Sequence, residues 1–206
     1  MSKVKLTKNE LRIQEKQKLQ LERYLPTLQL KKALLQSEVF EAKAEMSQYE
    51  QEYQSAYSCV SEYSPLLSET ISVDPLKIGK VQHIHRRMEN IAGIEVPYLD
   101  RVEFEPFDYF LVDTPPWLDS LVIGIRRLVE MRIKVKVALE KKQLLEEELR
   151  QVSIRVNLFE KILIPRCIAN IKKIKVFLGD QFLSTIGQMK IVKKKLSGEN
   201  PKCVSM

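Results

Sequence analysis

The residues best suited to chemistry in this sequence are two histidines separated by one position, His83 and His85. Alternate residues of a β-strand face the same side, so on a strand this pair would resemble two metal ligands. No cysteine, aspartate or glutamate at a suitable spacing completes a site, and the following residues, Arg86 and Arg87, are basic. We therefore expect no metal.

The remaining reactive side chains do not form a catalytic pattern. Glu146–Glu148 are a charge run of the kind that faces solvent on a helix rather than an acid–base pair. Cys59 and Cys167 fall at or near apolar helical positions, where we expect small core residues and not nucleophiles. Neither glycine-rich phosphate-binding motif occurs. The sequence predicts a protein that is not an enzyme and binds no cofactor.

The composition is that of a helical protein in a reducing compartment. Only 6 of 206 residues are glycine and 30% are charged. The 3 cysteines show no CxxC spacing, which argues against a disulfide framework and against a zinc site. No apolar stretch reaches the length of a signal peptide or a membrane helix. We expect a cytoplasmic protein with no direct membrane insertion.

The net charge of +7 is concentrated at the two ends of the chain. Residues 1–18 and 190–206 each carry roughly +4 by formal count, so the remaining length is close to neutral. The first block holds Lys3, Lys5, Lys8, Arg12, Lys16 and Lys18 against Glu10 and Glu15, and the second holds Lys190, Lys193, Lys194, Lys195 and Lys202 against Glu199.

Apolar residues recur with the alternating four-and-three spacing of a coiled coil. One series is Leu21, Leu28, Leu35, Ala42, Tyr49, Ala56 and Tyr63, and a second is Leu25, Val39, Met46, Tyr53 and Val60, interrupted by Lys32. A period of 3.5 residues predicts a left-handed supercoil. A second periodic stretch follows Trp117. Its members are Leu121, Ile125, Leu128, Val135 and Leu139, then Leu145, Leu149, Val152, Val156, Phe159, Leu163 and Cys167, and finally Ile171, Ile174 and Leu178. Pro26 predicts that the first helix starts, bends or is locally opened there, and we expect a bend. Pro165 predicts a bend in a helix that continues past it.

Between these stretches, residues 65–116 are rich in proline and contain short apolar runs. The alternation of Val102, Phe104, Phe107, Tyr109 and Leu111 predicts a strand, and residues 77–91 are compatible with a short helix. We expect a β-hairpin that packs on a helix or on the shaft, because the insert alone is too small for a secure core.

The fold class that follows is mainly α: a long antiparallel left-handed two-helix coiled coil with a small α+β insert at the hairpin turn. We assign 1–64 to the first shaft helix, 65–116 to the insert, 117–196 to the second shaft helix and 197–206 to a flexible basic tail.

Residues 150–178 resemble the signature of the D subunit of V-type and A-type ATPases. The matching positions are Arg155, Val156, Asn157, Leu158, Glu160, Ile164, Pro165, Arg166, Ile171, Lys172 and Ile174. Phe159 departs from the family pattern. The run Gly93-Ile94-Glu95-Val96-Pro97 is similar to a turn of the same family.

This resemblance implies a non-catalytic rotor subunit that couples ion translocation to ATP synthesis or hydrolysis. Its shaft tip would contact the A and B subunits of a catalytic ring, and its insert end would contact the F subunit and the membrane-side rotor subunit. The residues expected to bind partners are Arg155, Asn157, Glu160, Pro165, Arg166, Lys193, Lys194, Lys195, Gly93 and Pro97. We expect the basic ends to form the tip within the ring.

Two other functions remain compatible with the periodicity alone. A free-standing coiled-coil scaffold would explain the apolar series but not the proline-rich insert. A nucleic-acid-binding helical hairpin would use the lysines, but few cations without interleaved aromatic residues are weak support for that function. We therefore expect no nucleic-acid partner.

Overall fold

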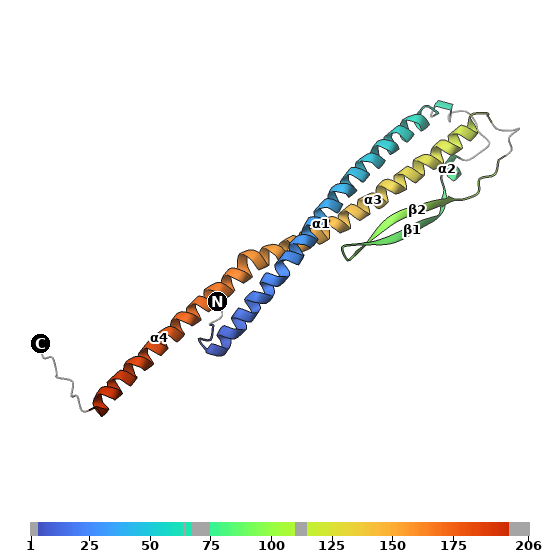
Figure 1. Ribbon diagram of the computed structural model, residues 1–206. Helices are drawn as coiled ribbons and strands as arrows, with labels where there is room; N and C mark the ends of the chain where they lie inside the picture. Colours follow the sequence, from blue (N-terminus) through green and yellow to red (C-terminus); the bar gives the residue numbers. More distant parts are fainter. Residues whose placement is uncertain (1–3, 64, 67–74, 110–114, 198–206) are drawn as a thin grey trace. The chain divides into compact units, whose positions relative to one another are not determined.

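The computed structural model describes residues 4–63, 65–66, 75–109 and 115–197, and most of these residues are helical. The chain divides into two compact units. Figure 1 shows the long helices and the β-hairpin that make up these units. The first unit combines Met1–Gln29 with Ile154–Met206, and the second is Leu30–Ser153. Apart from Ser197, the predicted tail at 197–206 lies outside the described residues.

The first long helix, α1, spans Lys8–Ser61 and contains Pro26 in its interior. The Thr7 side chain caps its start, where the Glu10 amide donates to Thr7 Oγ1 at 3.3 Å. Pro26 therefore does not begin the helix, although it has no N–H to donate to the preceding turn.

The second long helical stretch consists of α3 (Leu118–Leu158), a π-helical turn η2 (Phe159–Leu163) and α4 (Ile164–Leu196). The stretch continues through Pro165, as the periodicity predicts, and through Gly179 and Gly187. In η2 the amide of Ile164 donates to the carbonyl of Phe159, five residues earlier. This wider turn directly precedes Pro165, whose ring would crowd a regular α-helical turn.

In the second unit, α1 and α3 run antiparallel. Lys31 lies 3.0 Å from Glu148, and Lys43 lies 3.0 Å from Glu146. The buried residues of this part of α1 are Leu35, Val39 and Ala42, all of which belong to the predicted apolar series. The predicted helical hairpin with a small insert is confirmed by this arrangement. The hand of the supercoil stays a prediction.

The insert contains a short helix and a β-hairpin, but these elements lie at other residues than those we assigned to them. After the short helix α2 (Pro75–Ile78), strands β1 (Val81–Ile91) and β2 (Ile94–Phe104) pair antiparallel. The prediction of a helix across 77–91 was wrong for β1, because this segment finds its hydrogen-bond partners in β2 rather than in its own preceding turn.

The strand prediction around 102–111 was wrong from Glu105 onward. Phe107 and Tyr109 follow β2 and pack against a cluster formed by α2 and the start of α3, while Leu111 lies outside the described residues. The buried members of this cluster are Ile78, Leu118, Leu121 and Val122. A two-stranded sheet is only marginally stable in isolation, so this packing and the contacts to α3 hold the insert.

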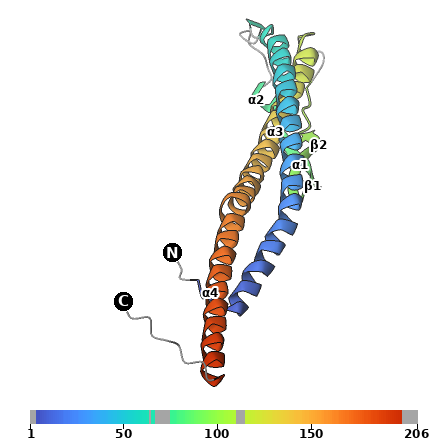
Figure 2. The ribbon, with the colours of Figure 1, turned by 60° about the vertical axis from the view of Figure 1, so that its left-hand side comes forward.

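In the first unit, the beginning of α1 lies beside α4. Asn170 Nδ2 donates to Gln14 Oε1 at 3.4 Å, and Lys175 lies 3.0 Å from Glu15. Cys167 is buried here, as predicted, whereas Cys59 in the other unit is exposed, so its assignment to the core was wrong. Beyond the start of α1, α4 continues as a single helix (Figure 2).

Among the described residues, no helix has the length and apolar character needed to cross a bilayer.

Candidate partner-binding surfaces

Five of the predicted partner-binding residues gather around the π-helical turn. Arg155 and Asn157 lie in the last turn of α3, Glu160 lies in η2, and Pro165 and Arg166 lie in the first turn of α4. All five are exposed. The structure thus groups them within one segment of the first unit, where the helical ladder is locally widened.

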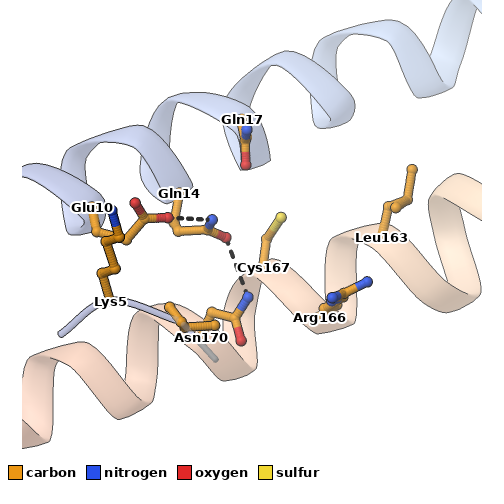
Figure 3. Close-up of a pocket in the computed structure, with 9 residues that line it drawn as sticks. Lys5, Glu10, Gln14, Gln17, Leu163, Arg166, Cys167 and Asn170 are labelled. Atoms are coloured by element: carbon orange, nitrogen blue, oxygen red, sulfur yellow. Dashed lines mark hydrogen bonds between the residues drawn. The ribbon is translucent and has the colours of Figure 1, made fainter. Parts of the chain in front are cut away.

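Arg166 also lines a cavity of about 420 Å³ in the first unit, next to Cys167 and Asn170 (Figure 3). The opposite wall comes from the start of α1 and the residues before it, including Val4, Lys5, Glu10, Gln14 and Gln17. Gln14 Nε2 donates to Glu10 Oε1 at 3.0 Å, and Gln14 accepts from Asn170. Amide side chains therefore replace apolar packing at this level of the helix pair.

The end of α4 carries the predicted lysines together with apolar side chains that nothing in the described chain covers. Lys193, Lys194 and Lys195 occupy its last turn. Phe182 is 66% exposed, Met189 66% and Leu196 82%. Contiguous apolar exposure of this kind marks an interaction surface.

Gly93 and Pro97 belong to the second unit, whereas the other predicted partner-binding residues belong to the first. Gly93 is in the turn between β1 and β2, with φ of 84°, and its amide donates to Asn90 Oδ1 at 2.9 Å. Pro97 is buried within β2, opposite Met88, so its assignment to a turn was wrong.

A buried lysine that the sequence did not reveal holds the hairpin against the helices. Lys141 of α3 is 7% exposed, and its Nζ donates to Glu45 Oε2 of α1 at 2.8 Å. The same ammonium lies 4.2 Å from the centre of the Tyr98 ring of β2. Burial by itself lowers the pKa of Lys141, but the bonds to Glu45 and Tyr98 outweigh it and the pKa is raised.

Two further contacts support this junction. Tyr49 donates its hydroxyl proton to Glu45 Oε1 at 3.0 Å, and burial followed by this bond raises the pKa of Tyr49. Arg86 of β1 lies 2.9 Å from Glu140 of α3. Glu45 therefore accepts two bonds from different helices, and the hairpin is attached through both strands.

One member of the histidine pair, His85, lies beside a carboxylate on the neighbouring strand. His85 Nε2 lies 3.1 Å from Glu103 Oε1 on the neighbouring strand, and the pKa of Glu103 is lowered, chiefly by this bond. The rings of His83 and His85 are 6.4 Å apart. Within the described residues no group of three or more histidine, cysteine, aspartate or glutamate side chains is arranged to hold a metal.

Comparison with known proteins agrees with the family resemblance seen in the sequence. The sequence model of the family described as the D subunit of ATP synthase matches residues 10–194. The D subunit of the V-type ATP synthase of Chlamydia caviae is 45% identical over 196 residues, which cover 95% of this chain and 94% of that protein.

The corresponding protein of Chlamydia trachomatis serovar L2 is 46% identical over 197 residues, covering 95% of this chain and 97% of the relative. That of Chlamydia pneumoniae is 44% identical over 194 residues, covering 94% and 93%. On the strength of a match along nearly its whole length, this chain belongs to the ATP synthase D-subunit family.

Proposed function

We propose that this chain is the non-catalytic central axle of a V-type rotary ATP synthase and turns inside a ring of A and B subunits. Membership of the D-subunit family makes it a central-stalk subunit of such a complex. The family match gives no support to a free-standing scaffold or to a nucleic-acid-binding hairpin.

The observation that carries the axle role is the single-helix end of α4. An isolated helix gains nothing in water from exposing Phe182, Met189 and Leu196, which are each at least 66% exposed. Lys193–Lys195 add positive charge beside these side chains. A surrounding ring with an apolar and acidic inner wall would cover both features, and the A and B subunits are its natural components.

The insert is the proposed docking module for the F subunit and the membrane-side rotor subunit. Ile123, near the start of α3, is 69% exposed beside the cluster that contains Phe107 and Tyr109. In this proposal, residues 1–64 and 117–196 form the shaft, and residues 65–116 form the docking module. The complex would place the chain on the cytoplasmic side, peripheral to the membrane.

Truncation at two points tests the role of the α4 end. Removing residues 190–206 deletes the last helical residues with their lysines, whereas the matched truncation of 198–206 leaves α4 complete. We expect the longer truncation to reduce assembly with the A and B subunits and coupled ATP turnover, and the shorter one to have little effect. Unchanged assembly and turnover after the longer truncation would refute the role of this end.

A further inference from the structure

The outward side of α1 in the second unit has an unusual composition. Two of the three heptad positions that point away from the α1–α3 seam carry no charge over four heptads, although 30% of the chain is charged; the third position holds one charged residue, Glu41. The residues at the two uncharged positions, which we call the outer face of α1, are Leu30, Ala33, Ser37, Phe40, Ala44, Ser47, Gln51, Gln54 and Ser58. All of them are exposed.

Solvent-facing positions of a coiled coil are normally charged, so an uncharged row needs another explanation. Leu30 is 73% exposed and Phe40 is 75% exposed, with small residues between and beyond them. The row is about 40 Å long at 1.5 Å per residue. Large side chains separated by alanine and serine form ridges and grooves that fit a second helix at close range.

The outer face also adjoins a concave surface. A groove of about 600 Å³ lies between α1 and α3, and Ser47, Gln51 and Gln54 of the outer face contribute to it. Arg132 and Val135 of α3 form the other side, with Tyr53 between the helices. A helix laid along α1 would therefore also contact α3 and form a three-helix bundle.

The two flanks of the outer face differ in charge, and this difference identifies the chemistry of the occupant. One flank carries Glu38, Glu41, Glu45 and Glu52. Only Glu45 of these is neutralised by a cation within the described chain, through Lys141. The other flank carries Lys43, which pairs with Glu146, and Glu50. A complementary helix would be uncharged along its seam and basic on one flank.

We propose that the outer face of α1 docks an amphipathic helix of another subunit, with lysine or arginine along the flank that faces Glu41. This rests on the proposed function, since it requires the chain to work inside a complex. A second copy of this chain fits less well, because an antiparallel pair of outer faces would bring the two glutamate flanks together.

Photocrosslinking in the assembled complex identifies the occupant. A photoreactive amino acid is placed at Ser37 or Ala44 of the tagged full-length chain, and at Glu147 of α3 as an exposed control outside the outer face. Both test positions are expected to crosslink to one helical segment of one other subunit, with basic residues on a single flank. A crosslink to a second copy, to an acidic or non-helical segment, or to nothing would overturn the proposal.

Charge reversal then tests the predicted orientation. Glu41→Lys is expected to weaken retention of the crosslinked subunit about tenfold, whereas Glu147→Lys, the same change at an exposed position of α3 outside the outer face, stays within about twofold. Equal effects of the two variants, or no effect of Glu41→Lys, would also overturn the proposal. Circular dichroism melting of each variant separates a folding defect from a docking defect.

The two proposals fail in different ways. If the tagged chain co-purifies with the A and B subunits but Ser37 and Ala44 crosslink to no subunit, only the docking surface is wrong. If it co-purifies with no ATP synthase subunit at all, the axle role is wrong.

Discussion

Lys141 Nζ lies 2.8 Å from Glu45 Oε2, so a single buried ammonium joins the two long helices of the second unit. The ammonium also lies over the Tyr98 ring, which extends the junction to β2. Removing one partner of such a pair leaves the other charge buried without compensation. The junction is therefore a sensitive point for the attachment of the hairpin.

Glu45→Ala is expected to destabilise the chain by about 2 kcal/mol, because Lys141 keeps its charge in a largely buried position. Lys141→Met in the same chain should recover much of this loss. Lys43→Ala is the matched control, since its pair with Glu146 is exposed and is worth about 0–1 kcal/mol. Urea unfolding measures the free energy of unfolding of all three variants. Equal losses of this free energy in Glu45→Ala and Lys43→Ala would contradict the role of the junction.

The same junction predicts a loss of stability in alkali. The pKa values of Lys141 and Tyr49 are raised above their ordinary values of 10.5 and 10.0. The folded chain therefore holds these protons more tightly than the unfolded chain, and the stabilisation is complete below pH 10 and lost as the pH rises through the raised values.

Urea unfolding at several pH values from about 9 upward is the appropriate measurement. Tyr49→Phe combined with Lys141→Met should flatten the decline in unfolding free energy across this range. A decline of the same steepness in the variant would assign the effect to other groups.

The turn of the hairpin offers a test of backbone strain. Ala92 has φ of 52°, which is unfavourable for a residue with a Cβ, and Gly93 has φ of 84°. Ala92→Gly should stabilise the chain by up to about 1 kcal/mol, and Gly93→Ala should destabilise it by about 1–2 kcal/mol. No atom lies within 4 Å of a Cβ added at Gly93, so the loss of stability in Gly93→Ala comes from the backbone conformation and not from a steric clash. Thermal melting measures both effects. A lower melting temperature for Ala92→Gly, or a higher one for Gly93→Ala, would contradict this geometry.

The π-helical turn before Pro165 gives a prediction about a deletion. Removing Lys161 should convert η2 to a regular turn and bring the Pro165 ring against a backbone carbonyl, at a cost of about 3 kcal/mol. Pro165→Ala should relieve most of this cost in the deletion variant. Deletion of Lys173 within α4 is the control, because it rotates the following apolar side chains and Pro165→Ala cannot repair it. Failure of Pro165→Ala to rescue the Lys161 deletion would show that η2 has another cause.

The periodic apolar pattern predicted the two long helices, because apolar residues such as Leu35 and Val39 are buried along one stripe of the helix surface. It failed where a polar residue takes a core position. Lys141 is buried while Leu139 is 39% exposed, and neither assignment follows from apolarity. Glu45 and Tyr98 stabilise the buried charge of Lys141, and both residues lie far from it in the sequence.

The insert was harder to predict, for a related reason. β1 contains few apolar residues and pairs only with β2, so its conformation depends on the turn at Ala92 and Gly93 rather than on its own pattern. The grouping of Arg155, Asn157, Glu160 and Arg166 on one exposed segment was predictable from their closeness in sequence. The uncharged outer face of α1 was also readable, once the seam positions were known.

Co-purification of the tagged full-length chain from native membranes, with its partners identified by mass spectrometry, tests the axle role most directly. The account predicts that the A and B subunits of a V-type ATP synthase are recovered with it in a stable complex. Recovery of a lone dimer of this chain, or of nucleic acid as its partner, would contradict it.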